Sequence, residues 1–394
     1  TDPSPPIEAT ISLGVDDKTR HWLYFRLSPR SEQERENSIH KTDIGGASAT
    51  QKVKVYDGRD VQPRLTLDDA SFELVECPTK LSTEEFYALQ DVGHPSASEL
   101  KDRYYEEVRE FAKSKLGCDE VIVFHHQVRS ADGAGAREGV QGYAGGAPHT
   151  DSSPVSADEA ALSMAGGGRY ERYAYLNLWR NISDDPIEND HLAMLDERTT
   201  VKPDDYIAKD LFMDNDYHVV QYNLGARHAH RHKWYYYPRM TKDEGILFKQ
   251  MDSDWTKPSR ICFHMSVGDA GLEAAKNRES IEVRMMCYWA KADSGVDSMP
   301  TRENTHADLV DSVAKRDAAG ASLESASALQ LLKALLWKPF AWMSGDAGGG
   351  GKSSYSGDPA DYAARFTEAA RVFPSWPAFA KAWVKGEMQK AASK

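Results

Sequence analysis

The sequence has few cysteines and no pair of them in a redox or zinc-binding spacing. Cys77, Cys118, Cys262 and Cys287 are the only four in 394 residues, and no Cys-x-x-Cys motif occurs. Two of them lie in apolar runs that are typical of core strands. We therefore expect four free thiols, a reducing compartment and a cytoplasmic protein.

Basic charge is also scarce. The chain has 48 lysines and arginines against 61 aspartates and glutamates, a formal net charge of −13 and a sequence pI near 5.5. Nucleic acids and anionic lipid surfaces are bound by clustered lysine and arginine, which this balance does not favour. We expect a small-molecule substrate as the partner, and neither nucleic acid nor a membrane.

The sequence lacks a long apolar run and a recognisable export signal. Its most apolar stretch, Leu329 to Met343, is interrupted by Lys333, Lys338 and Pro339, whereas a membrane helix needs roughly 20 apolar residues. The first residues, Thr1 to Pro6, show neither the charged region nor the apolar block of a signal peptide. Both absences predict a chain without a membrane span.

The composition that is present favours a folded protein with one large domain and an appendage, or two modest domains, because 40% of the residues are hydrophobic. Residues 1–52 are polar, except for a short strand-like run from Trp22 to Phe25, and predict an N-terminal arm. Residues 53–300 predict the main domain. Residues 301–394 are rich in alanine with helical periodicity and predict a helical extension, which is a candidate for a homodimer surface or for a lid.

One helix is predicted between Ser96 and Gly117. Ser96 and Glu99 have the spacing of a capping box, and Gly117 is suited to end the helix. Apolar residues recur between them at helical spacing: Leu100, Tyr104, Val108 and Phe111. The following run, Val121 to Phe124, predicts a buried strand.

Short runs of β-branched and aromatic residues, separated by turn residues, fill the second half of the main domain. They are Tyr173 to Trp179, Tyr217 to Tyr222, His232 to Tyr237, Gly245 to Met251, Arg260 to Val267 and Ser280 to Trp289. This succession predicts an antiparallel sandwich or jelly roll. The expected fold class is mainly β with helices, a double-stranded β-helix core and a C-terminal helical appendage.

A glycine-rich segment from Ala131 to Pro148 leads directly onto His149, and it is interpreted as a lid beside a chemical site. His149-Thr150-Asp151 places an imidazole and a carboxylate on the same side of an extended backbone. A third ligand is available from His264, which lies in a strand-like run. Two histidines and one carboxylate on one face of an octahedron leave three positions open, as non-haem iron oxygenases require.

The motif by itself is weak, because His306-Ala307-Asp308 repeats it, but no histidine follows His306. A stronger indication lies 14 residues after His264, where Arg278-Glu279-Ser280 opens the next predicted strand. A guanidinium and a hydroxyl on one face form a receptor for the distal carboxylate of 2-oxoglutarate. Arg284 shares that face in a regular strand and is a second candidate.

The chain resembles a known family on several collinear segments. They are Val55 to Arg59, Pro148 to Asp151, Leu176 to Arg180, His232 to Pro238, Leu247 to Lys249, Asp252 with Ser253, and Arg278 to Arg284. These segments resemble the fungal hydroxylase/desaturase family, related to cephem methoxylation proteins and gibberellin desaturase, within the 2-oxoglutarate-dependent oxygenases. The resemblance runs from about Val53 to Trp289.

This resemblance implies a double-stranded β-helix with iron(II) on His149, Asp151 and His264, and with 2-oxoglutarate anchored by Arg278. It also implies O2 as oxidant and a role in secondary metabolism, by hydroxylation, desaturation or oxidative cyclisation of an unactivated C–H bond. The alternative is a cupin-like metalloprotein with isomerase or lyase activity, which does not need Arg278 and Ser280.

Two further interpretations stay open at this point. Asn177 and Trp179 point the same way on their predicted strand, and Asn177 is a candidate to hydrogen-bond the co-substrate or the substrate. His228, His230 and His232 would share one strand face. A solvated or hydrogen-bonded row of histidines is favoured there over a second metal site or a substrate-binding wall.

Overall fold

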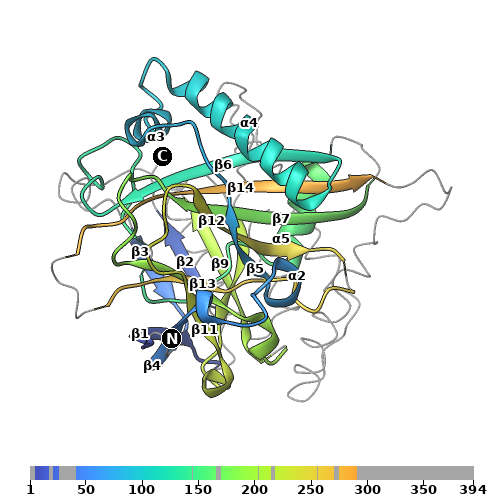
Figure 1. Cartoon of the computed structure of the whole chain (residues 1–394). Helices are drawn as coiled ribbons and strands as arrows, with labels where there is room; N and C mark the ends of the chain where they lie inside the picture. The colour runs from blue at the N-terminus through green and yellow to red at the C-terminus, as the bar shows by residue number, and fades with distance from the viewer. Residues whose placement is uncertain are drawn as a thin grey trace, which may run out of the picture.

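The computed structural model describes residues 5–16, 21–25, 41–143, 145–165, 170–202, 204–213, 218–254, 256–269 and 275–290. Within them the protein is built mainly of antiparallel strands, which form two facing layers (Figure 1). The chain matches the jelly-roll fold that its strand pattern predicts. The predicted helical extension, residues 301–394, lies outside the described residues.

The first layer is a five-stranded sheet in the order β5-β12-β7-β14-β6. Its strands are β5 (Phe72–Glu76), β12 (Glu244–Asp252), β7 (Tyr170–Asn181), β14 (Glu279–Ala290) and β6 (Glu120–Ser130). All neighbours in this sheet run antiparallel. Two helices, α3 (Thr83–Gln90) and α4 (Ala97–Leu116), cover its outer face, and α4 lies along β6 (Figure 1).

The residue pattern of β14 explains how this sheet is placed. Ile281, Val283 and Met285 pack in one apolar cluster with the residues of α3 and α4. The alternate positions, which include Ser280 and Arg284, therefore face the interior between the layers, because strand side chains alternate with a period of two. The first half of this strand thus presents polar side chains to the interior and apolar side chains to the helices.

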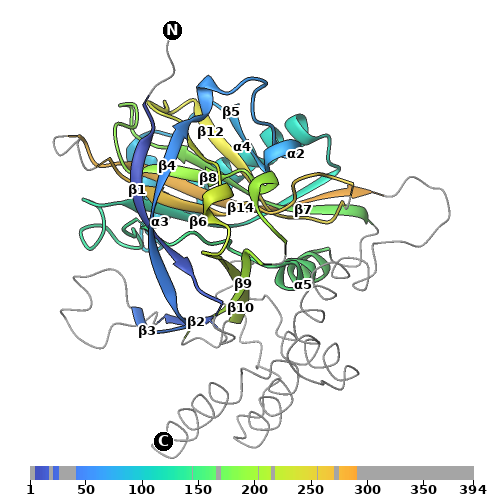
Figure 2. The same cartoon turned by 90° about the horizontal axis from the view of Figure 1, so that it is seen from below.

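The second layer contains the order β1-β4-β11-β8-β13 and a four-stranded group β10-β9-β2-β3. The strands of the first set are β1 (Ile7–Gly14), β4 (Ser48–Asp57), β11 (Trp234–Tyr236), β8 (His191–Leu195) and β13 (His264–Val267). Those of the second are β10 (His218–Leu224), β9 (Tyr206–Met213), β2 (His21–Phe25) and β3 (Lys41–Gly45). Figure 2 shows this second group extending away from the β6–β14–β7 layer.

The two sets of strands meet at the segment that carries His149. Its amide donates to the carbonyl of His264 at 3.2 Å, and the amide of His264 donates back at 3.0 Å. On the other side, the amide of Thr150 donates to the carbonyl of Tyr222 in β10 at 3.0 Å. The segment therefore lies between β13 and β10, which places His149 and His264 opposite each other.

The remaining short elements connect these layers. They are η1 (Gly58–Asp60), α2 (Leu67–Ala70), α5 (Pro154–Met164), η2 (Glu197–Thr199) and η3 (Ala229–Arg231). The strand predicted at Val121 to Phe124 lies near the start of β6. Strands β1, β3, β5, β8 and β9 were not predicted from the sequence, because they are short or flanked by charged residues rather than by clear turn residues.

The helix at residues 97–116 confirms one predicted signal and corrects another. Gly117 has a φ of 64° and ends α4, as predicted. The capping box predicted at Ser96 is wrong, because Ser96 has φ −96° and ψ 2° and its side chain caps nothing, whereas an N-cap needs extended backbone. A complete capping box is found instead at Ser82 and Glu85, at the start of α3.

Two predicted boundaries differ from the structure. The run Arg260 to Val267 forms a strand only from His264, since the amides of Arg260 and Ile261 donate to the carboxylate of Glu197 instead of to a neighbouring strand. The N-terminal arm contains β1, which pairs with β4 over Ile7 to Gly14. The boundary at residues 52/53 falls within β4, and the division into domains stays a prediction.

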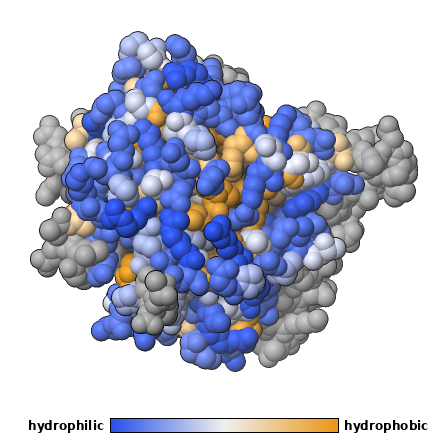
Figure 3. Space-filling model, in the orientation of Figure 1, coloured by the Kyte–Doolittle hydropathy of each residue, from blue (hydrophilic) through white to orange (hydrophobic). Residues whose placement is uncertain are grey.

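The visible face of the molecule is mostly hydrophilic, with a narrow hydrophobic strip near its centre (Figure 3). Only Tyr56 and Val92 are large hydrophobic residues with exposed side chains among the described residues. Within the same residues, every helix is too short or too polar to cross a membrane.

Candidate metal centre

The three predicted metal ligands come together between the two layers. Nε2 of His149 and Nε2 of His264 each lie 3.9 Å from Oδ1 of Asp151. One ligand atom from each residue lies within 4.8 Å of the other two. Asp151 and His264 are almost fully buried, and the His149 side chain is 19% exposed. Protein therefore encloses Asp151 and His264, and solvent reaches the group of three ligands at His149.

Backbone carbonyls fix the orientation of both imidazole rings. Nδ1 of His149 lies 2.9 Å from the carbonyl of Ala147, and Nδ1 of His264 lies 3.5 Å from that of Cys262. An Nδ1–H that donates to a carbonyl leaves the Nε2 lone pair for a metal ion. Burial, followed by the charge of His264, lowers the pKa of His149 to about 3. His149 is therefore neutral near pH 7, which is its ligating form.

The second oxygen of Asp151 is held by two side chains from the first layer. Nδ2 of Asn177 donates to Oδ2 at 2.6 Å, and the guanidinium of Arg284 lies 3.2 Å from the same oxygen. Burial by itself raises the pKa of Asp151, but the charge of Arg284, the two neighbouring imidazoles and the hydrogen bond from Asn177 outweigh it and hold this pKa below its usual value. The carboxylate is ionised, and Oδ1 is the oxygen that faces the histidines.

Two glutamines hold the backbone of the same aspartate. Oε1 of Gln250 accepts from the amide of Asp151 at 2.7 Å, and Nε2 of Gln221 donates to its carbonyl at 3.2 Å. Both are buried. Sequence reasoning missed these two residues, because a glutamine inside a predicted strand has no spacing signal that separates it from a solvent-facing one.

Ser280 lies at the beginning of β14, on the interior face, and Arg278 immediately precedes this strand. One Nη of Arg278 contacts the carbonyl of Asp190 and, at 3.1 Å, the Oγ of Ser266 in β13. Its guanidinium stacks on the ring of Tyr143, 4.1 Å from the ring centroid. Nε of Arg278 and Oγ of Ser280 are buried and have no hydrogen-bond partner among the described residues. Burial lowers the pKa of Arg278 to about 10, so it is still charged at neutral pH.

Arg284 and Arg278 have different partners in the structure. Arg284 faces the interior, as predicted, but its partners are Asp151 and Glu282, both at 3.2 Å. Tyr143, which belongs to the glycine-rich segment, covers Arg278 and donates its hydroxyl to the backbone carbonyl of that residue at 2.6 Å. No motif or spacing marks Tyr143 as a site residue beyond its place in the glycine-rich segment.

The three alternating histidines do not share a strand face. A turn of 3-10 helix, η3, separates His228 from His232. Nε2 of His228 lies 3.2 Å from Asp204, and Nε2 of His232 lies 2.9 Å from Asp205. The favoured interpretation of hydrogen-bonded histidines is confirmed for these two, while the predicted strand over them is wrong because the chain turns before β11.

A jelly roll that brings two histidines and one aspartate together in its interior is the architecture of the non-haem iron(II) oxygenases. Residues 15–288 match the family described as "Oxidoreductase/YMDC permease-like domain". The match spans well over half of the 394 residues, and the chain belongs to this oxidoreductase family.

Curated relatives refine the family. The chain is 27% identical to the alpha-ketoglutarate-dependent dioxygenase tstK of Talaromyces stipitatus over 255 residues, which cover 60% of this chain and 84% of that protein. It is also 27% identical to the hydroxylase/desaturase efuI of Hormonema carpetanum over 265 residues, 61% of this chain and 84% of that protein. The expected membership of the fungal hydroxylase/desaturase family of 2-oxoglutarate-dependent oxygenases is confirmed.

A solved structure shares the fold. The iron and alpha-ketoglutarate-dependent endoperoxidase NvfI superimposes with a TM-score of 0.57 at 22% identity, over 73% of this chain and 99% of that one. This similarity confirms the jelly-roll fold class. The cupin-like isomerase or lyase, which was the alternative, finds no counterpart among these relatives.

Proposed function

We propose that His149, Asp151 and His264 bind iron(II), and that Arg278 and Ser280 bind the distal carboxylate of 2-oxoglutarate. One observation carries this proposal: the ligand group lies in the same interior as the buried Nε of Arg278 and the buried hydroxyl of Ser280, neither of which has a hydrogen-bond partner among the described residues. A buried polar atom without a partner costs about 1–3 kcal/mol. A carboxylate at Nε of Arg278 and Oγ of Ser280 removes that penalty, and imidazole with carboxylate is a donor set that suits iron(II).

With iron(II), 2-oxoglutarate and O2 bound, the site supplies oxidation of an unactivated C–H bond in a small molecule. The protein's part is to orient the ligands. Asn177 and Arg284 occupy Oδ2 of Asp151, so that Oδ1 alone faces the metal position. Oδ1 would be the oxygen that holds iron(II) together with His149 and His264, and the metal would bind 2-oxoglutarate and O2 as the ligands that the protein does not provide. Oδ1 of Asn177 has no hydrogen-bond partner among the described residues and is available to co-substrate or substrate.

The reaction is expected to be a hydroxylation, a desaturation or an oxidative cyclisation in secondary metabolism. The support is the names of the relatives, which include dioxygenases and hydroxylase/desaturases. A reducing, cytoplasmic location is supported by Cys77, Cys118, Cys262 and Cys287, which are all buried and free. A homodimer formed through residues 301–394 stays a prediction from the sequence.

The test of this function is an anaerobic titration of the protein with iron(II) and then 2-oxoglutarate. We expect one equivalent of iron, followed by the weak visible charge-transfer band of the 2-oxo acid chelate. His149→Ala and His264→Ala remove one of three ligands and should lose both iron and band. His306→Ala is the matched control, because it alters the other His-x-Asp sequence, and it should keep both. Loss of iron in the control and retention in His264→Ala would falsify the assignment.

A further inference from the structure

Strand β12 contains one residue more than its neighbour. Lys249 pairs with Leu176 of β7, and Met251 pairs with the next residue of that strand, Tyr175. Gln250 therefore has no partner across the ladder and forms a β-bulge. A bulge sets two consecutive side chains on the same face of the sheet and bends the strand.

The bulge changes which residues share a face. Phe248, before the bulge, lies on the interior face, where its ring is 4.9 Å from that of His264. Gln250 and Met251 both lie on this interior face, the first on the amide of Asp151 and the second in the interior apolar cluster. Lys249 and Asp252 consequently share the outer face, although residues three apart on a regular strand face opposite ways.

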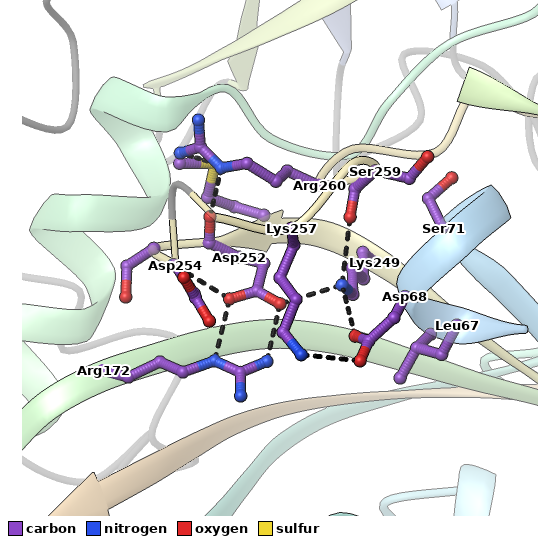
Figure 4. A network of polar contacts seen from close by, with 12 residues as sticks. Leu67, Asp68, Ser71, Arg172, Lys249, Asp252, Asp254, Lys257, Ser259 and Arg260 are labelled. Carbon is purple, nitrogen blue, oxygen red and sulfur yellow. Dashed lines mark hydrogen bonds and ion pairs between the residues drawn. The ribbon is translucent and has the colours of Figure 1, made fainter. Parts of the chain in front are cut away.

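On that outer face Lys249 and Asp252 form an ion pair of 2.9 Å, and both side chains are 0% exposed. Nζ of Lys249 also donates to Asp68 at 3.1 Å and to the carbonyl of Ser259 at 3.0 Å, so its three protons have three acceptors. Arg172 holds both oxygens of Asp252, at 3.0 and 2.7 Å. Figure 4 shows Lys249 at the centre of this network, with Asp68 and Asp252 on either side.

The pair depends on the bulge, since in a regular strand that keeps Gln250 in register Lys249 and Asp252, three residues apart, would lie on opposite faces. Breaking a buried ion pair leaves an uncompensated charge, which is strongly unfavourable. The pair therefore opposes any slip of β12 that would straighten the bulge. It also fixes a second contact, because the carbonyl of Lys249 accepts the amide of Cys262 at 2.8 Å, two residues before His264.

We propose that the buried Lys249–Asp252 pair locks the bulge that holds Gln250 on the Asp151 peptide, so that these residues position a metal ligand from the far side of the sheet. Lys249, Asp252 and Gln250 touch no metal-ligating atom and act through the backbone of Asp151 and the strand leading to His264. The inference rests on the proposed metal site and concerns how that site is held. Mutation of residues that hydrogen-bond to metal ligands commonly lowers metal affinity tenfold to a hundredfold.

The experiment measures the affinity of the full chain for Co(II), whose visible spectrum reports ligand geometry, together with the thermal midpoint without metal. Gln250→Leu and Lys249→Met should each weaken Co(II) binding by about tenfold and change the spectrum. Because both act through one bulge, the double variant should bind about as weakly as the weaker single variant, rather than about a hundredfold below wild type.

Lys257→Met is the matched control. Lys257 contacts Asp68 in the same network, at 2.6 Å, whereas the lysine paired with Asp252 is Lys249. It should leave Co(II) affinity and spectrum unchanged even where the midpoint falls. If Lys249→Met does not fold, the isosteric Asp252→Asn takes its place.

Three results separate the hypotheses. Wild-type affinity and spectrum in Gln250→Leu, or in a destabilised but folded Lys249→Met, overturn this inference and leave the metal site standing. Multiplicative losses in the double variant also overturn it, because the two residues then act independently. A wild-type chain that binds neither Co(II) nor iron(II) overturns the proposed function instead.

Discussion

Arg284 lies in β14 and Arg278 immediately precedes this strand, and their surroundings differ. Arg284 has ion partners in Asp151 and Glu282, and it therefore supports the metal ligand. Arg278 has no ion pair among the described residues, and its guanidinium is stacked and buried with one nitrogen unpartnered. A buried cation without a counter-charge is expected where a ligand brings the anion.

The first residue-scale prediction follows from this difference. Arg278→Ala should weaken 2-oxoglutarate binding by about 3–5 kcal/mol, because the co-substrate carboxylate loses its counter-charge in a buried site. This corresponds to roughly a hundredfold to several-thousandfold in affinity. Ser280→Ala should have a milder effect through loss of one hydrogen bond. The measurement is the co-substrate titration described above, with iron content determined in parallel.

Arg284→Ala serves as the comparison in that titration. It should weaken iron binding more than co-substrate binding, since its partner is Asp151. If Arg284→Ala instead gives the large co-substrate effect with iron unchanged, the carboxylate clamp is at Arg284. If neither arginine affects the co-substrate, the 2-oxoglutarate assignment of β14 fails.

At the scale of elements, the glycine-rich segment is tied at several points rather than free. Nε2 of Gln127 donates to the carbonyl of Gly139, Nη1 of Arg129 donates to that of Gly142, and Tyr143 caps Arg278. Most of these contacts are made by backbone carbonyls of the loop. Since glycines contribute no side-chain packing, opening the loop costs few apolar contacts. Tyr143 is the residue through which this segment contacts Arg278 and hence the proposed 2-oxoglutarate site.

We predict that cleavage of this segment by a protease falls when iron(II) and 2-oxoglutarate bind, because the ligand fixes Arg278 and Arg278 fixes Tyr143. Limited proteolysis, with the sites located by mass spectrometry, measures the rate with and without ligands. In Tyr143→Ala the protection should disappear, while Tyr56→Ala, at an exposed position 43% accessible, should retain it. Equal cleavage with and without ligands in the wild-type chain means that residues 131–148 are a passive connector.

At the scale of the whole molecule, burial of neutral histidines links stability to pH. His126 lies beneath α4, where the hydroxyl of Tyr105 is 2.8 Å from its Nδ1, and burial lowers its pKa to about 4. Burial, with the nearby charge of Arg278, lowers the pKa of His191 to about 4 as well. Both imidazole rings are therefore neutral in the folded protein near pH 7.

The sign of the effect follows from linkage. The unfolded chain binds the extra proton below about pH 6.5, and the folded chain only near pH 4, so stability falls as pH falls through that window. Each histidine contributes about 1.4 kcal/mol per pH unit within it. Urea unfolding of the metal-free protein from about pH 7 to about pH 5 should show this loss. His126→Gln should reduce the slope by about one proton, and a slope unchanged by that substitution contradicts the assignment.

Much of the architecture was predictable because local patterns determine it. Alternation and β-branched residues located β7, β10, β12 and β14, and the fixed spacings His-x-Asp and Arg-x-Ser supplied candidates for the site. These signals work because a strand has a period of two, so sequence spacing alone states which side chains share a face. The collinear segments then indicated the family.

Other features depend on contacts between distant segments, and only the tertiary structure decided them. Gln250 holds Asp151 from 99 residues away, and the bulge that aims it is stabilised by Lys249 and Asp252, whose spacing in a regular strand predicts opposite faces. Arg284 was assigned to the co-substrate from its face alone, while its distance to Asp151 gives it another partner. The sequence by itself determined which residues could ligate and which side chains share a face of a regular strand. The bulge in β12 and the different partners of Arg278 and Arg284 were decided by packing, because they depend on distances across the fold.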